Sequence, residues 1–299
     1  MRVEWEAEAR VSDGDRTGAG VSNGTESLQG IAESRPSGSR RLALNRTPVS
    51  LAAALALAGV ALAEFVTAYV NPLYGVLGHI VLLGVFLSLG ALTQDTRYQV
   101  FFLTMTIAPL IRILSLGMPL GRFPQPYWYV LTAIPLFAAA WSIARTLKIP
   151  RASLNLRLPS WRLLPIELAV GVSGLGLGVV EWSILHPKPI PGSSSIAWLI
   201  ATPLILLICT GFIEEILFRG LIQYAAGNLV GSNGGLAVTV ALFAALHTGW
   251  HSPVDVAFVA GVALYFGLVV RCTRSLLGVT MAHGAINTVL FVVLPLTVR

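Results

Sequence analysis

The sequence predicts an all-α fold, a polytopic transmembrane bundle of about 8–9 helices, on three observations. Of the 299 residues, 55% are hydrophobic and 11% are charged, with a mean hydropathy of +0.75, far from a soluble domain. From Val49 onward, apolar runs of about 18 to 25 residues recur, each long enough to cross the hydrocarbon core as a helix. Basic residues gather in the amino-terminal segment and between the runs, as topology signals do. The net charge of +6 therefore indicates no nucleic-acid partner.

Residues 1–47 differ in kind from the rest of the chain. They mix acidic residues and arginines in a Gly- and Ser-rich background without apolar periodicity, so they cannot bury a core. We expect a disordered polar tail. A signal peptide is not expected, because the first apolar run begins only near Val49, has spanning length and lacks a small-residue cleavage site.

Nine apolar runs follow the tail, but only Asn71-Pro72 separates the first two, so eight or nine helices are expected. The runs lie near residues 49–70, 73–92, 99–120, 127–147, 163–185, 196–226, 234–250, 254–271 and 275–296. We interpret residues 48–190 as an amino-terminal set of transmembrane helices. Residues 195–296 form a second part, which holds the three motifs described below.

Charge bias orients the bundle. Basic residues cluster before the first run and after the fourth, which favours a cytoplasmic position for both segments. With nine spans, the same rule places the loop that holds Arg271 and Arg274 inside and the carboxyl terminus outside. We therefore expect an integral membrane protein, in the plasma membrane of a prokaryotic cell, with a cytoplasmic amino terminus.

Several ionisable residues in the runs lie outside the motifs. They are Glu64, His79, Arg112, Glu167 and Glu181. Charged groups at bilayer depth are costly and usually pair. We hypothesise an interhelical ion pair between Glu64 and Arg112.

A series of glycines marks the run at 163–185. Its members are Gly171, Gly174, Gly176 and Gly178. Small side chains let transmembrane helices approach closely, so the series predicts close helix packing. It is not a phosphate loop, because neither a preceding strand nor a Lys-Ser/Thr ending accompanies it.

The first motif puts two carboxylates and an arginine into an apolar run, as Glu214-Glu215-x-x-x-Arg219. Each such group costs at least about 2.5 kcal/mol at bilayer depth, so it persists where it pairs, faces a water-filled cavity or reacts. Glu215 and Arg219 are four residues apart and share a helix face, so they can pair. Glu214 lies about 140° around the helix from Arg219 and is left for chemistry.

Two further motifs place histidines in apolar runs, as Phe243-x-x-x-His247 and His283-x-x-x-Asn287. Each spacing puts its two side chains on one helix face. Small residues beside both histidines would allow these helices to approach closely. We expect the two histidines and Asn287 to converge with Glu214 in one intramembrane cavity.

Two chemistries fit such a cluster, and both hydrolyse peptides. A carboxylate beside a neutral histidine can deprotonate water, while the second histidine and the amide donate hydrogen bonds to an oxyanion. Alternatively, Glu214, His247 and His283 would hold zinc or another divalent metal, which activates water and polarises the carbonyl. The absence of an HExxH motif and the placement of the histidines on different runs count against metal. The sequence leaves both schemes open.

In this order on successive runs, EExxxR, FxxxH and HxxxN resemble the three motifs of the CPBP family of CAAX proteases and bacteriocin-processing enzymes. Each motif alone is weak, but three in order are a strong combined signal. The resemblance covers residues 195–296, and residues 1–190 show no recognisable counterpart. It implies a CAAX-protease-like membrane core in residues 195–296.

The resemblance also implies roles by position. Four residues would be catalytic: Glu214, His247, His283 and Asn287. The first two would activate water, and the last two would form the oxyanion site. Three others, Glu215, Arg219 and Phe243, would support the site. Because the family has been described both as metalloproteases and as metal-independent glutamate-type enzymes, the metal stays open.

The function predicted is that of an intramembrane endopeptidase. Its partners would be the lipid bilayer and a membrane-associated peptide or protein substrate. One alternative is a non-catalytic membrane scaffold or bacteriocin-immunity protein that keeps the motifs and acts by binding. A transporter is the third hypothesis, since intramembrane Glu and His residues can relay protons, but the sequence shows no internal repeat.

Overall fold

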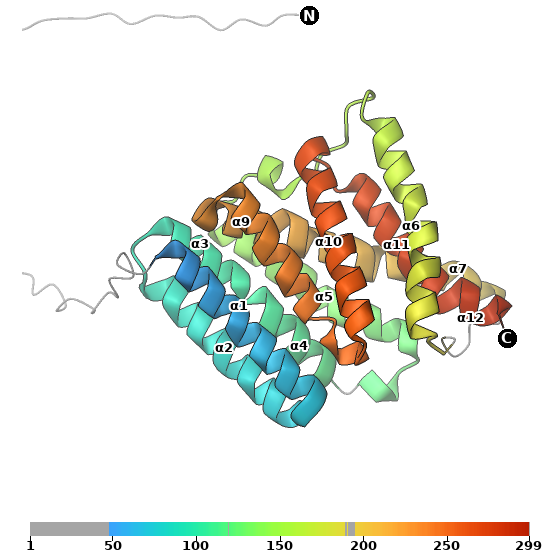
Figure 1. Ribbon diagram of the computed structural model, residues 1–299, viewed down its shortest axis with the longest axis horizontal. Helices are drawn as coiled ribbons and strands as arrows, with labels where there is room; N and C mark the ends of the chain where they lie inside the picture. The colour runs from blue at the N-terminus through green and yellow to red at the C-terminus, as the bar shows by residue number, and fades with distance from the viewer. Residues whose placement is uncertain (1–47, 119, 189, 191–194, 299) are drawn as a thin grey trace, which may run out of the picture. The chain divides into compact units, whose positions relative to one another are not determined.

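The computed structural model describes residues 48–118, 120–188, 190 and 195–298 (Figure 1). Every regular element in this part of the chain is a helix, so the all-α prediction is confirmed. The tail predicted for residues 1–47 lies outside the described residues.

Eight helices among the described residues are long and apolar enough to cross a membrane. They are Val49–Val70, Pro72–Leu92, Thr96–Gly117, Gln125–Thr146, Leu164–Leu185, Ile196–Trp250, Pro253–Thr273 and Leu277–Thr297. The sixth is 55 residues long and is broken at Gly231, whose φ of 83° is non-helical. Its two arms pack together where Gly235 meets the backbone of Gly227. The two arms correspond to the sixth and seventh predicted runs, so the predicted number of eight or nine membrane-spanning helices is confirmed.

The shorter elements subdivide these spans. The first four spans contain α1 (Val49–Phe65), η2 (Val66–Val70), α2 (Pro72–Leu92), α3 (Thr96–Met105), α4 (Ile107–Gly117) and α5 (Gln125–Thr146). The short turns η3 (Leu120–Arg122) and η4 (Arg151–Leu154) lie in loops, and α6 (Leu164–Leu185) is the fifth span. The long sixth helix contains α7 (Ile196–Leu206), η5 (Leu207–Phe212), α8 (Ile213–Glu215), η6 (Ile216–Ile222), α9 (Gln223–Ala245) and η7 (Thr248–Trp250). The last spans are α10 (Pro253–Thr273) and α11 (Leu277–Thr288), the latter continued by η8 (Val289–Val293) and α12 (Leu294–Thr297).

Polar side chains define where several spans begin. Asn71 accepts a hydrogen bond from the backbone N–H of Leu73 at 2.9 Å, just before Pro72 opens α2. Ser252 accepts one from the backbone N–H of Asp255 at 3.2 Å at the start of α10. Such caps satisfy N–H groups that have no partner in the first turn. The Asn71-Pro72 pair thus ends one helix and begins the next, which makes the first two spans a hairpin.

The helix α9 lies at the centre of the bundle. It packs against α1 and α3 on one side and against α10 on the other, while α11 packs against α6 (Figure 1). The first four helices lie side by side (Figure 1). This arrangement brings the three motif-bearing segments together, and the amino-terminal helices α1 and α3 cover one side of α9.

The hypothesised pair of Glu64 and Arg112 is confirmed. The Nη2 of Arg112 lies 2.6 Å from Oε2 of Glu64, and its Nε donates to Oε1 at 2.8 Å. Charge-assisted pairs of this two-point geometry are among the stronger hydrogen bonds in proteins. His79 joins the cluster, with Nε2 3.2 Å from Glu64. Arg112 also donates to the carbonyl of Leu246 at 2.8 Å, so this cluster ties the amino-terminal helices to the residue that precedes His247.

Glu167 holds the beginning of α11. Its buried carboxylate accepts a hydrogen bond from the backbone N–H of Gly278. A carboxylate is favourable at a helix amino terminus, where N–H groups lack partners and the helix dipole is positive. Glu167 therefore fixes the position of the helix that carries His283 and Asn287.

The glycines of α6 explain how closely α6 and α11 approach. A Cβ at Gly174 would collide with the backbone of Ala282, and one at Gly178 would lie 2.8 Å from Cβ of Val289. Gly171 also faces α11, at Met281. The prediction of close packing is confirmed at these three positions. It is wrong for Gly176, which faces open space because it points away from α11.

This difference makes a matched pair of substitutions. We expect Gly174→Val to lower stability by about 2 kcal/mol or more, because overpacking against backbone cannot be relieved by a side-chain movement. Gly176→Val should leave stability nearly unchanged. The check is the unfolding midpoint of each purified variant in detergent, and equal midpoints for the two would contradict the close contact of α6 with α11.

Candidate active site

Glu214 and Glu215 lie on α8, a single turn between two π-helical segments, η5 and η6. Wide π-type turns are rare in proteins, and those that occur are often found at functional sites. Neighbouring side chains on a helix diverge by about 100°, so the two carboxylates have different surroundings.

Glu215 and Arg219 form the predicted ion pair. Nη1 of Arg219 lies 2.9 Å from Oε1 of Glu215, and both side chains are 0% exposed. The guanidinium also lies over the rings of Phe243 and Phe266, at 4.7 and 5.4 Å from their centroids. Aromatic faces attract cations, most strongly when water is excluded. The cost of burying this arginine is thus offset by one carboxylate and two rings.

His283 binds the same carboxylate oxygen. Its Nδ1 lies 2.8 Å from Oε1 of Glu215, and since an ionised carboxylate only accepts, Nδ1 is the donor. The other ring nitrogen, Nε2, lies 3.8 Å from Oε2 of Glu214. Glu214 is 31% exposed, unlike Glu215. One carboxylate therefore orients His283, and the other stands at its outer edge.

His247 is oriented by its own helical turn. Its Nδ1 lies 2.7 Å from the carbonyl oxygen of Phe243. A carbonyl cannot donate, so Nδ1 carries the proton and Nε2 of the neutral ring has a free lone pair. The ring centroids of Phe243 and His247 lie 4.8 Å apart, which confirms that the FxxxH spacing places both side chains on one helix face. The backbone has thus prepared His247 to accept a proton at Nε2.

Asn287 is oriented by Thr210. The Thr210 hydroxyl donates to the carbonyl of Leu206, so its oxygen is left to accept from Nδ2 of Asn287 at 2.8 Å. This fixes the amide with its NH₂ end toward Thr210. One N–H of that group remains available for another acceptor.

A small cavity joins three of the four expected residues. It has a volume of about 40 Å³ and is lined by both histidines and Asn287, together with Phe243 and Glu181. One water molecule requires roughly 10–15 Å³ on this measure, so the cavity has room for water. Glu214 is not among the lining residues, which corrects that part of the expectation, but its Oε2 lies beside the cavity, 3.8 Å from Nε2 of His283. Consecutive side chains on a helix diverge by about 100°, and Glu215 is the one directed into the packed interior.

Residues 196–289 match the family model described as type II CAAX prenyl endopeptidase Rce1-like. This segment begins at the first residue of α7 and contains all three motifs. The recognition of the CPBP family is confirmed over this segment. A search of the curated proteins and one of the solved structures found no match to the chain. The Rce1-like segment thus has the sequence of a protease-like hydrolase, and it lies in a membrane-spanning helix bundle.

The Rce1-like segment does not present a ready metal site. No group of three or more His, Cys, Asp or Glu side chains is placed to hold a metal ion within the described ranges. In the set suggested for zinc or another divalent metal, Nδ1 of His247 is engaged by a carbonyl and that of His283 by Glu215, which leaves Nε2 of each ring free, as metal-ligating histidines also have it. The suggested ligands are nevertheless not gathered around one point among the described residues, so a metalloprotease is not supported.

Sequence reasoning missed two contributors to the site. Thr210 lies four residues before Glu214, so its helical spacing could have drawn attention to it. Glu181 was noted only as an intramembrane charge, and nothing in its local sequence indicates that α6 brings it to the cavity. Both depend on contacts between spans that are distant in the chain.

Proposed function

We propose that the chain is an intramembrane endopeptidase that hydrolyses a peptide bond of a membrane-associated protein or peptide. One observation carries the proposal: His247, His283 and Asn287 line a water-sized cavity, and each has a second polar group that fixes its orientation. Sites held in this way cost little reorganisation during a reaction. The Rce1-like match over the same residues supports a peptide bond as the target.

In the proposed reaction, a water molecule attacks the carbonyl carbon of the scissile peptide bond. His247 at Nε2, together with Glu214, removes the proton from this water. The oxyanion accepts hydrogen bonds from Asn287 and from Nε2 of His283. When the tetrahedral intermediate collapses, the C–N bond breaks and the proton passes to the leaving amine.

His283 can donate at both ring nitrogens only as an imidazolium. Carboxylate oxygens lie at both of its edges, 2.8 and 3.8 Å away, so an imidazolium at this position would have a carboxylate beside each ring nitrogen. Glu215, Arg219 and Phe243 are thus positioning residues rather than catalytic ones, because they act through His283 and His247.

The substrate must reach a cavity far smaller than a peptide. A volume of about 40 Å³ admits water but no peptide segment, so the helices around the cavity must separate for the substrate to enter. Such gating motions are common in enzymes that exclude water. A prenylated CAAX protein is one candidate, since the matching family model is described as a CAAX prenyl endopeptidase, and other membrane-anchored peptides are alternatives. The proposed setting is a prokaryotic plasma membrane, with the amino terminus in the cytoplasm.

Quantitative proteomics of peptide termini tests this function and identifies the substrate. Cells with the intact protein should contain new termini that vanish when the chain carries Glu214→Gln at the same abundance. Such termini should persist with Asp95→Asn, which makes the same change in a surface pair with Arg97. A rescue phenotype that Glu214→Gln retains, without any change in termini, would favour the scaffold or immunity protein instead.

A further inference from the structure

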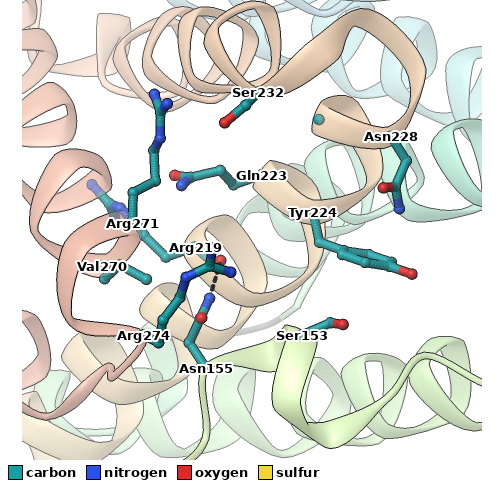
Figure 2. A pocket seen from close by; sticks show the side chains of 11 residues that line it. Ser153, Asn155, Arg219, Gln223, Tyr224, Asn228, Ser232, Val270, Arg271 and Arg274 are labelled. Carbon is teal, nitrogen blue, oxygen red and sulfur yellow. Dashed lines mark hydrogen bonds between the residues drawn. The ribbon is translucent and has the colours of Figure 1, made fainter. Parts of the chain in front are cut away.

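A larger cavity lies at the end of α10. Its volume is about 490 Å³, within the range of roughly 300–1,000 Å³ typical of small-molecule sites. It shares no lining residue with the cavity between the histidines. In Figure 2, Arg271 and Arg274 extend from α10 on one side of it, and Tyr224 and Asn228 of α9 lie on the other.

The lining of this cavity is cationic. It contains arginines but neither Asp nor Glu. Nη2 of Arg271 donates to the neutral side-chain oxygen of Asn233 at 3.0 Å. The side chain of Arg274 makes no hydrogen bond or ion pair with the part of the chain that the structure describes. Besides Arg219, which pairs with Glu215, two guanidinium groups therefore face one space without a carboxylate partner, and guanidinium forks match phosphate oxygens well.

Polar side chains line this cavity both at its exposed rim and at its buried floor. Arg274 and Asn228 at the rim are exposed. Asn155 on the floor is buried, and its Nδ2 donates to the carbonyl of Arg219 at 3.3 Å. Oε1 of Gln223 is buried and accepts no hydrogen bond from the described residues. A ligand that fits this lining has anionic oxygens for the arginines and polar groups for the amides.

The position of the cavity along the bundle fits a lipid headgroup. The helix α10 has 21 residues, about 31 Å at 1.5 Å per residue, which matches the hydrocarbon thickness of roughly 30 Å. Arg271 and Arg274 lie in the last turn of α10 and at its C-cap, so they lie at the depth of phospholipid phosphates. Ser153 of η4 also lines the cavity. Clusters of arginines at a membrane surface attract anionic lipids.

We propose that this cavity binds a phosphate-bearing anion, namely the headgroup of an anionic phospholipid, through Arg271 and Arg274. Zwitterionic headgroups fit less well because the lining offers no carboxylate to their ammonium group. The proposal does not depend on the peptidase function.

Native mass spectrometry of the purified protein in detergent tests the proposal. Phosphatidylglycerol should bind more tightly than phosphatidylcholine. The double variant Arg271→Gln/Arg274→Gln should weaken phosphatidylglycerol binding by at least about tenfold, because each charged hydrogen bond that is lost contributes substantially. Asn228→Asp, which adds a negative charge at the rim and keeps both arginines, should weaken it as well. Unfolding midpoints verify that each variant is folded.

Arg97→Gln is the matched control, since Arg97 lies at the start of another span and pairs with Asp95. It should bind phosphatidylglycerol like the unchanged protein. Glycerol phosphate and inorganic phosphate form the second arm. Another outcome is that these phosphates bind as tightly as the lipid and fail to bind to the double variant. That result would confirm an anion site but would show that its ligand is a soluble phosphate, not a lipid. Equal binding of both lipids, or unchanged binding by the folded double variant, would overturn the proposal.

Discussion

Glu214→Gln and His247→Ala are each expected to lower the rate of peptide cleavage by at least about 100-fold. A general base typically contributes 10²–10⁴-fold, so its removal costs about this factor. The glutamine keeps the shape of the side chain and removes its negative charge. Because Glu214 is partly exposed and forms no hydrogen bond in the described ranges, its change should not unfold the protein. The measurement is cleavage of the identified substrate by purified protein in liposomes.

The double variant sharpens this test. If Glu214 and His247 act on the same water, the combined loss should be little greater than either single loss. Asp95→Asn should retain the full rate, since Asp95 pairs with Arg97 away from the cavity. Normal cleavage by a folded Glu214→Gln protein would remove Glu214 from the mechanism.

Arg219→Leu is expected to cause the largest loss of stability. Its guanidinium pairs with a carboxylate that is 0% exposed, so its removal leaves Glu215 buried without its main counter-charge. Breaking a buried pair from one side typically costs about 3–5 kcal/mol. The loss should appear as a lower unfolding midpoint in detergent. Arg97→Leu, which removes an exposed arginine from a surface pair, should leave the midpoint unchanged.

The double variant Glu215→Leu/Arg219→Leu separates stability from positioning. Replacing a buried pair by apolar residues is often neutral or stabilising, so the midpoint should recover. Cleavage should not recover, because His283 would lose the acceptor that fixes its Nδ1. Full activity in this double variant would show that Glu215 has no positioning role.

The fold followed closely from the sequence because hydrocarbon imposes strict conditions on the backbone. Apolar runs of spanning length must be helical, since only a helix satisfies its own N–H and C=O groups in lipid. Helical spacing likewise paired Glu215 with Arg219 and Phe243 with His247. The hypothesis for Glu64 and Arg112 succeeded because charges in lipid must find one another.

The local pattern alone did not determine which groups from different spans meet. Three contacts depend on how helices far apart in the sequence pack. Glu215 binds both Arg219 and His283, Thr210 orients Asn287, and Glu181 reaches the cavity. The same holds for Gly176, which resembles its neighbours in sequence but faces away from α11. The sequence by itself determined the membrane setting, the helices and the motif residues, because their causes are local: hydrophobicity and the period of the helix. The tertiary structure decided their partners, because contacts between spans depend on side-chain fit across the whole bundle.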